Sequence, residues 1–444
     1  MSTKSPPHRR RAAEALQGFL GAWEQLVGPR GIPTLAPRRG RKPRVPVSDL
    51  LPALTFHVMN GPGTLAEHFC QLFGTHLADS SWSDRRARLP WEIFAELMRR
   101  LLRPRATRRH PDAFWRGWRV LALDGTQFSV TNTPQITTTL RKARTRRGVA
   151  AFAKITTTVL LEVGLHNPLA VAIGRHGEYE WDLARSLLAQ LPARALVLGD
   201  RLYGCGPFAA LLAAACQRVG SHFLLRARTE IKPRVLRRLV DGSRLIHVSV
   251  RDRRRRIVQV LELREIRVHV GRRGHRSSAL RLWTTLVNPQ TAPALELAQV
   301  YARRWDHELY FRQLKRQLRR TALLQSHTVE TAAQEIAALV LVSALIAAER
   351  ARVAAGRVPV LRVSFSKVLE LVKPMWLTVQ LGDGLLTNRQ IDQMLARAYD
   401  LMRQCVIPPR RARTCPRAIR QPVSRWPRLL QPASIEGPVD FHIV

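Results

Sequence analysis

Apolar residues in the first quarter of the chain recur at helical spacing. Three such segments lie between residues 46 and 105, with the sequences VSDLLPALTFHVM, TLAEHFCQLFG and PWEIFAELMRRLLR. Side chains three or four positions apart line one face of a helix, which then packs on a neighbour. Between the last two segments, LADSSWSDRRARLP places Ser81 or Ser83 where it can cap a short basic helix. The pattern predicts short helices that form either a DNA-binding module or a generic helical subdomain.

From about residue 113 the pattern changes to short apolar runs typical of β-strands. The predicted strands are GWRVLALDGTQFSV (117–130), FAKITTTVLLEVG (152–164), PLAVAIG (168–174), ARALVLGD (193–200) and SHFLLRAR (221–228). Two helical segments, EYEWDLARSLLAQL and GPFAALLAAACQRV, alternate with the later strands. Strands and helices in this order predict an α/β core.

Residues 229–278 interrupt this core with alternating apolar and charged positions, as in LIHVSV and IVQVLELREIRVHV. Such alternation is typical of antiparallel strands with one face in solvent, so we expect a β insertion. A long helix then begins near Ala294 and contains YARRWDHELYFRQLKRQL, and a second covers roughly 330–355. Its apolar run from Ile336 to Ala348 is shorter than the roughly 20 residues of a membrane span, which predicts a buried helix and no membrane association.

These segments predict six regions along the chain. They are a basic arm or linker (1–45), a helical N-terminal domain (46–112), the first part of the core (113–228), the β insertion (229–278), the second part of the core (279–358), and a C-terminal helical region with a Pro- and Arg-rich tail (359–444). The tail from Pro408 onward is expected to be extended, on the protein body or on nucleic acid.

The charge of the chain indicates a polyanionic partner. Lys and Arg number 73 against 32 Asp and Glu, a formal net charge of +41. Nucleic acid is the leading partner because Lys and Arg contacts to phosphate supply most non-specific affinity. Ribosome binding, membrane adhesion or an Arg-rich genome would give the same excess. The five cysteines form no Cys-x-x-Cys pair, which argues against a disulfide framework or zinc site and favours a reducing compartment.

Four polar residues share one stripe of the long helix. Tyr301, Arg304, Glu308 and Lys315 fall at about 0°, 300°, 340° and 320° for an ideal helix, and Arg312 flanks them at about 20°. A stripe of Tyr, Arg, Glu and Lys suggests a functional site. The alternative is a solvated face with pairs four residues apart, such as Arg304 with Glu308.

Two aspartates follow apolar strands: Asp124 after VLAL and Asp200 after LVLG. Ligand sites in α/β sheets form at the carboxyl ends of strands. Asp124-Gly125 is also a sequence that favours a tight turn. Together with Glu308, however, the aspartates give three carboxylates, and hard Mg²⁺ or Mn²⁺ ions prefer such oxygen ligands. Two ions about 4 Å apart can activate an attacking oxygen and stabilise the leaving oxygen of a phosphodiester.

These residues carry a resemblance to a known family. YARRWDHELYFRQLK matches the Tyr-x2-Arg-x3-Glu-x6-Lys signature of insertion-sequence transposases of the IS-four type, which have an Asp-Asp-Glu site. ALDGTQF resembles the first aspartate block, LVLGDRLYG the second and SHFLLRAR the strand after it. DSSWSDRRARLP is similar to the family's N-terminal region and RWPR to its C-terminal tail. The resemblance covers about residue 45 to about residue 430, with one departure at Leu202, where many relatives have glycine.

The resemblance implies an RNase H-like catalytic core with a β-strand insertion domain, preceded by the helical DNA-binding domain. Asp124, Asp200 and Glu308 would be the catalytic metal ligands, for two Mg²⁺ or Mn²⁺ ions. Tyr301, Arg304 and Lys315 would contact phosphates near the transposon end, with Arg312 beside them. Trp283 lies close to a tryptophan that stabilises a flipped base in relatives, although a tryptophan on an apolar strand is more often a core residue.

The implied reaction is cut-and-paste transposition in the bacterial cytoplasm, at the nucleoid. A homodimer would pair two terminal inverted repeats of double-stranded DNA in a synaptic complex, cleave through a hairpin intermediate and join the ends to target DNA. No ATP is required, and the chain has no Gly-x4-Gly-Lys-Ser/Thr loop. Three alternatives stay open: an inactive DNA-binding descendant of a transposase, a nuclease of the same fold without strand transfer, and a basic RNA- or ribosome-associated protein.

Overall fold

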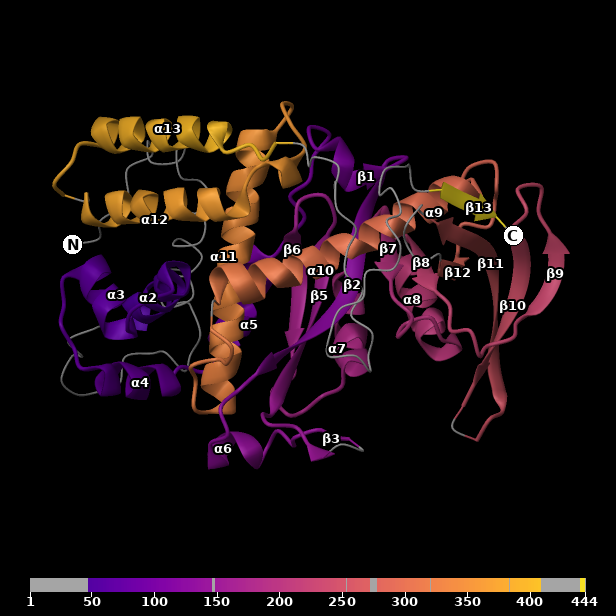
Figure 1. The fold of residues 1–444 in the computed structure, drawn as a ribbon, viewed down its shortest axis with the longest axis horizontal. Coiled ribbons are helices and arrows are strands. Elements are labelled where there is room, and N and C mark those ends of the chain that lie inside the picture. Colours follow the sequence, from indigo (N-terminus) through magenta and orange to yellow (C-terminus); the bar gives the residue numbers. More distant parts are fainter. Residues whose placement is uncertain are drawn as a thin grey trace, which may run out of the picture. The chain divides into compact units, whose positions relative to one another are not determined.

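The structure, a computed structural model, describes residues 47–145, 148–252, 254–271, 278–319, 321–382, 384–408 and 440–443 (Figure 1). The fold is mixed α/β, as predicted, and it divides into two compact units. Unit 1 comprises Met1–Gln190 with Asp306–Ile407, and unit 2 comprises Leu191–Trp305 with Pro408–Val444. The predicted N-terminal arm (1–45) and the RWPR segment lie outside the described residues. The boundaries between the two units lie near residues 190, 305 and 407, and they do not test the six predicted regions, which stay predictions.

Helices of unit 1 come from both ends of the chain. They are α2 (Val47–Asn60), α3 (Leu65–Phe73), α4 (Asp79–Ala87), α5 (Trp91–Leu101), α6 (Pro134–Thr137), α7 (Glu180–Leu187), α10 (Asp306–Arg312), α11 (Val329–Ala354), α12 (Phe365–Leu381) and α13 (Asn388–Gln404). Short 3-10 turns cover Pro111–Ala113, Leu188–Gln190 and Val360–Arg362, and a π-helical segment, η6, covers Gln313–Leu318.

Helix α11 is the centre of the core of unit 1. It contacts α2, α4, α5, α12 and α13 as well as strand β6 (Asn167–Ile173), and Figure 1 shows it between those helices and the strands. It is long and apolar enough to cross a membrane by length and composition alone, but its most apolar stretch is 94% buried inside the protein. The prediction of a buried helix here is confirmed.

The N-terminal helices share one hydrophobic core with α11 and α12. Helix α3 begins as expected from its sequence, because Thr64 and Glu67 form a reciprocal capping box. Helix α4 begins at Asp79 with no side-chain cap, so the prediction that Ser81 or Ser83 caps it is wrong. Both serines lie inside the helix, because helical pairing already starts where the Trp82 amide bonds to the Ala78 carbonyl.

The sheet of unit 1 has the order β6-β5-β2, with β5 at Lys154–Glu162 and β2 at Trp118–Ser129. All its pairs are antiparallel, and short β1 (Phe114–Trp115) pairs with β2. A separate two-stranded ladder joins β3 (Arg144–Thr145) and β4 (Gly148–Val149). Helix α10 contacts β2, and α7 contacts β2, β5 and β6.

Unit 2 is built on a larger sheet with the order β7-β8-β12-β11-β10-β9. Its strands are β7 (Ala195–Gly199), β8 (His222–Arg226), β9 (Arg234–Arg238), β10 (Arg244–Arg251), β11 (Ile257–Gly271), β12 (Ser278–Thr284) and β13 (Asp440–Ile443), which pairs with β11; its helices are α8 (Gly206–Arg218) and α9 (Ala294–Ala302), followed by the 3-10 turn η5 (Arg303–Trp305). β7 and β8 are parallel and joined by α8, and the other pairs are antiparallel. The strands of the predicted β insertion therefore continue the β7–β8 sheet through β12.

Candidate active site

Asp124 lies in the middle of β2, and the pairing of β2 with β5 continues as far as Ser129. The predicted strand at 117–130 is therefore confirmed, but Asp124 does not lie near its end, and the alternative of an Asp-Gly turn is wrong because Gly125 pairs with Thr158 inside the ladder. A side chain at position 125 would meet the Glu180 carboxylate group, at 2.3 Å from its Cδ. Glycine thus allows α7 to pack against this strand beside Asp124.

Glu308 lies on α10, which contacts β2 and whose His307, Tyr310 and Phe311 are buried. Glu308 itself is exposed, as is Arg312 one turn later, while Asp124 is half-buried. Unit 1 therefore brings the helix of Glu308 against the strand of Asp124 and leaves both carboxylates accessible to ligands. This contact joins two sequence blocks that the apolar pattern alone could not connect.

Lys315 is tied to the same strand. Its Nζ donates to Thr126 Oγ1 at 2.5 Å and lies 5.3 Å from the centre of the Phe128 ring. Thr126 is two positions from Asp124, so the two side chains leave the strand on the same side. Burial, and then the charges of Arg319 and Lys154, lower the pKa of Lys315. Thr126 is a residue of this site that the sequence signature did not reveal.

The segment from Tyr301 to Lys315 is not the regular α-helix that the sequence predicted. It passes from α9 through the 3-10 turn η5 into α10 and then into the π-helical η6. Rotation per residue differs among these three helix types, so the stripe calculated for an ideal helix does not describe these side chains. Tyr301 and Arg304 belong to unit 2, and Glu308, Arg312 and Lys315 to unit 1.

In unit 2, Asp200 directly follows strand β7, as predicted. Its Oδ1 accepts a hydrogen bond from the Leu202 amide at 2.7 Å, which fixes the carboxylate in a tight local turn. Leu202 is not among the described residues with a left-handed backbone, so a leucine is tolerated where relatives have glycine. Tyr203 is fully buried and packs on Phe208, with ring centres 4.8 Å apart. The departure at Leu202 thus leaves the Asp200 turn intact.

Tyr301, on α9, forms a hydrogen bond with the last residue of β7. Its hydroxyl donates to the Gly199 carbonyl at 3.3 Å, next to Asp200, and its ring is buried. Burial raises the pKa of Tyr301 to about 12; Arg304 and Arg226 oppose this shift and Asp200 adds to it, so these charges lie near the hydroxyl. Arg226 is a second residue that the sequence signature missed.

Trp283 lies in the core of unit 2 and is fully buried. Its indole Nε1 donates to Glu265 Oε2 at 3.2 Å across the β11–β12 pair, and Glu265 also accepts from Arg267 and Arg281. With its ring covered by side chains, Trp283 is not available to stack on a base in this structure. Trp305 in η5, in contrast, is 57% exposed, and the sequence pattern did not single it out.

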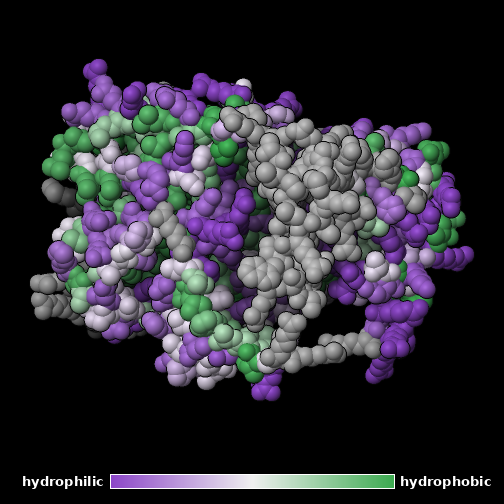
Figure 2. Space-filling model, in the orientation of Figure 1, coloured by the Kyte–Doolittle hydropathy of each residue, from purple (hydrophilic) through white to green (hydrophobic). Residues whose placement is uncertain are grey.

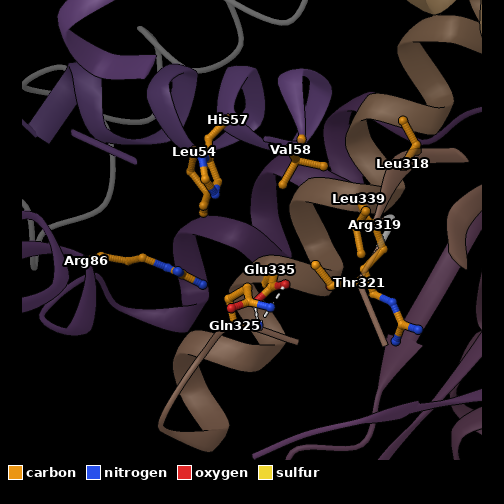
Figure 3. Close-up of a pocket in the computed structure, with 11 residues that line it drawn as sticks. Leu54, His57, Val58, Arg86, Leu318, Arg319, Thr321, Gln325, Glu335 and Leu339 are labelled. Carbon is orange, nitrogen blue, oxygen red and sulfur yellow. Dashed lines mark hydrogen bonds between the residues drawn. The ribbon is translucent and has the colours of Figure 1, made fainter. Parts of the chain in front are cut away.

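A small cavity of about 60 Å³ in unit 1 lies between α2, α4 and α11, at the end of η6 (Figure 3). Arg86, Arg319, His57 and Glu335 contribute polar atoms to its lining. The volume is far below the roughly 300 Å³ of common ligand pockets. Arg86 also points inward and donates to Gln334 and Ser326, so it anchors α4 to α11. The cavity is a packing feature rather than a nucleotide site.

The donors suit a hard divalent cation, because Asp124, Asp200 and Glu308 offer only carboxylate oxygens. Among all the residues that the structure describes, no three His, Cys, Asp or Glu side chains gather into a group that could hold a metal ion. Asp124 and Glu308 belong to unit 1, and Asp200 belongs to unit 2.

The chain is similar to known transposases. Residues 115–345 match the family described as Transposase DDE domain. Over 324 residues the chain is 25% identical to transposase InsG for insertion sequence element IS4 of Escherichia coli (strain K12), which covers 71% of each protein. A cryo-EM structure of a piggyBac transposase synaptic complex with hairpin DNA is similar at 9% identity and a TM-score of 0.46, over 88% of this chain and 87% of that chain.

The family match spans slightly more than half of the 444 residues. It runs through β2, β7, α10 and η6 and thus through both units. The predicted resemblance to IS-four-type insertion-sequence transposases is confirmed, and with it DNA transposition as the activity. The chain belongs to the DDE transposase family.

Proposed function

We propose that this transposase moves an insertion sequence by cut-and-paste transposition, with Asp124, Asp200 and Glu308 as its catalytic metal ligands. The observation that carries the proposal is the packing of α10 against β2, since it brings the Glu308 helix to the Asp124 strand in one compact unit. Asp200 completes the set through its place after β7 and the second sequence block. The core is RNase H-like in this proposal, and the helices of residues 46–112 bind DNA.

The three carboxylates would hold two Mg²⁺ or Mn²⁺ ions. Such ions activate an attacking oxygen and stabilise the leaving oxygen at a phosphodiester. Lys315, Arg312 and Arg304 supply positive charge that attracts the DNA backbone and keeps the carboxylates ionised. In unit 2, the bond from Tyr301 to the Gly199 carbonyl steadies the turn that presents Asp200.

The DNA partners are the terminal inverted repeats of the element and a target duplex, and the ends pass through a hairpin in this reaction. Two copies of the chain pair the ends in a synaptic complex at the bacterial nucleoid. Exposed apolar residues of α12, α13 and the loop between them support a contact between copies: Leu381 is 48%, Leu385 84% and Met394 50% exposed. Figure 2 shows hydrophobic residues gathered over these helices.

The decisive experiment uses supercoiled plasmid carrying the DNA that flanks the source gene. Wild type and Glu308→Gln are compared with Mg²⁺, with Mn²⁺ and with chelator, and both nicked and joined products are quantified. We expect metal-dependent nicking and joining by the wild type alone. Cleavage without joined products would identify a nuclease, and binding without cleavage by either protein on verified ends would identify an inactive DNA-binding descendant.

A further inference from the structure

The π-helical segment η6 is the irregular part of the site in unit 1. It covers Gln313–Leu318, directly after the helix that carries Glu308, and contains Lys315. A π segment closes hydrogen bonds five residues apart and is uncommon, so it persists where surrounding contacts stabilise it. Relaxation to α-helical pairing would turn Lys315 by on the order of tens of degrees relative to Glu308.

One contact that stabilises η6 comes from His166, in the turn between β5 and β6. Its Nδ1 lies 3.0 Å from Gln313 Oε1, in a pair separated by 147 positions in the sequence. The amide oxygen can only accept, so Nδ1 carries the proton. Burial, and then the charge of Arg350, lower the pKa of His166 to about 3, and the ring is neutral at working pH. The Nδ1–H group of His166 is therefore present as a donor at neutral pH.

His166 is fixed in its own right. It is 4% exposed, has a φ of 54° and packs edge-on to Tyr310 of α10, with ring centres 6.5 Å apart. The Tyr310 hydroxyl in turn lies 3.0 Å from Ser343 Oγ on α11. A left-handed backbone is uncommon for histidine, and here the histidine ring packs on Tyr310 of α10. The β5–β6 turn thus offers η6 a rigid hydrogen-bond donor.

We propose that His166 is a positioning residue that holds the π turn through Gln313 and so directs Lys315 toward Thr126, beside Asp124. Lys315 Nζ donates a hydrogen bond to Thr126 Oγ1. Gln313, two residues before Lys315, accepts a hydrogen bond from His166. The two bonds fix η6 between β2 and the β5–β6 turn. This inference rests on the proposed function for the role of Lys315 in DNA binding, but the geometry it predicts does not depend on activity.

Two substitutions separate the hydrogen bond from general stability. Gln313→Met removes the acceptor while keeping side-chain length and helix propensity. His166→Asn keeps an N–H donor near the position of Nδ1, and asparagine is among the residues that accept a left-handed backbone. The bond is lost in the first variant and preserved in the second.

The experiment measures the reactivity of the Lys315 amine in full-length protein by acylation with a water-soluble ester and mass spectrometry. We expect Gln313→Met to raise Lys315 labelling at least threefold, because the bond to Thr126 is weakened, and His166→Asn to leave it within twofold of wild type. Lys367, exposed on α12, is the internal reference. Equal Lys315 labelling in wild type and Gln313→Met would overturn the proposal.

End binding gives a second test. Gln313→Met should weaken binding of end DNA about fivefold in the wild-type background and less than twofold in a Lys315→Met background, because both changes remove the same contact. Equal effects in the two backgrounds would make Gln313 merely structural and overturn the proposal. If no variant cleaves DNA, the proposed function fails, whereas the labelling result still decides the role of His166.

Discussion

In unit 1 the candidate residues are held by contacts between distant parts of the sequence, whereas in unit 2 Asp200 is held mainly by its own turn. Lys315 bonds to Thr126 across 189 positions, and Asp200 bonds to the Leu202 amide two positions away. The Asp200 carboxylate is therefore fixed by a nearby residue, and its turn has long-range support from Tyr301, which bonds to the Gly199 carbonyl, and from Arg228, which bonds to the Arg201 and Leu202 carbonyls. In unit 1, the segments that carry Glu308 and Lys315 reach the strand of Asp124 only through contacts between distant parts of the sequence.

The largest expected effect is a loss of DNA cleavage, and it should be the same for variants in unit 1 and in unit 2. Asp124→Asn, Asp200→Asn and Glu308→Gln preserve shape but remove the negative charge that a divalent cation needs. Each should lower end cleavage by on the order of 10³-fold, measured as nicked product over time in Mg²⁺. Binding of end DNA, measured by fluorescence anisotropy in chelator, should stay within about threefold of wild type. If Asp200→Asn cleaved normally while the two variants of unit 1 did not, the proposed set of three carboxylates would be wrong.

A smaller effect concerns the free energy of unfolding, which should fall more when a buried carboxylate is removed from unit 1 than from unit 2. In unit 1, fully buried Glu162 accepts from the Arg105 and Ala106 amides at 3.0 Å and pairs with Arg119. In unit 2, buried Glu265 accepts from the side chains of Trp283, Arg281 and Arg267, and the Arg267 side chain is 40% exposed, whereas that of Arg119 is 17% exposed. Removing one partner of a buried pair costs about 3–5 kcal/mol when the other stays buried.

We therefore expect Glu162→Ala to lower the free energy of unfolding by about 3–5 kcal/mol and Glu265→Ala by about half as much. Chemical denaturation, followed by circular dichroism, measures both values. Arg99→Ala is the control, because its partner Glu96 lies on an exposed helix face and such pairs contribute under about 1 kcal/mol. A larger loss for Glu265→Ala would contradict the view that unit 1 depends more on its buried contacts.

The sequence predicted those parts of the site that are local. Asp200 after an apolar strand, the buried helix α11 and the order of the three carboxylate blocks were all readable, because each depends on a short pattern. The strand at 117–130 was readable as well, and β2 covers Trp118–Ser129, but the place of Asp124 near its middle was not, because the apolar run stops at Leu123 while the pairing continues to Ser129. The π turn of η6 was equally hidden, because its support comes from His166, 147 positions away.

Trp283 shows a different limit of sequence reasoning. The resemblance placed it close to a base-binding tryptophan of relatives, but its burial depends on the neighbouring strand, where Glu265 accepts from its indole. Arg86 is similar, since a run of basic residues predicts an exposed face while Gln334 and Ser326 of the core bind its guanidinium group. Whether such side chains face solvent is decided by hydrogen bonds to residues far away in the sequence, and not by the residue type alone.

Acid should weaken unit 1 through its buried histidines. Burial, aided by neighbouring positive charges, lowers the pKa of His57 to about 4 and that of His166 to about 3. Both histidines bind protons more readily when unfolded, where the pKa is about 6.5. The free energy of unfolding should therefore fall by about 1–3 kcal/mol between pH 6.5 and pH 5 and be insensitive to these groups above pH 7.

Thermal unfolding across pH 5–8 measures this loss. Burial also lowers the pKa of His68 in the same unit, so His166→Asn removes one of three such groups and should make the decline shallower. A decline as steep as in wild type would exclude His166 as a source of the acid sensitivity. In unit 2, burial also lowers the pKa of half-buried His222, so its substitution should change the slope less.

The smallest expected effect concerns a single phosphate contact of unit 1. Lys315→Met removes one cation directed at the strand of Asp124, whereas Arg316→Met removes an equal charge from an exposed neighbour in the same π turn. If Lys315 contacts a phosphate, its loss should lower the slope of log affinity against log salt by about one, and Arg316→Met should change it much less. Equal changes would mean that η6 contributes only diffuse charge, because a direct contact releases counterions at one position and a distant charge does not. The long-range packing of unit 1 would then orient Glu308 alone, and Lys315 would serve mainly to fasten η6 to Thr126.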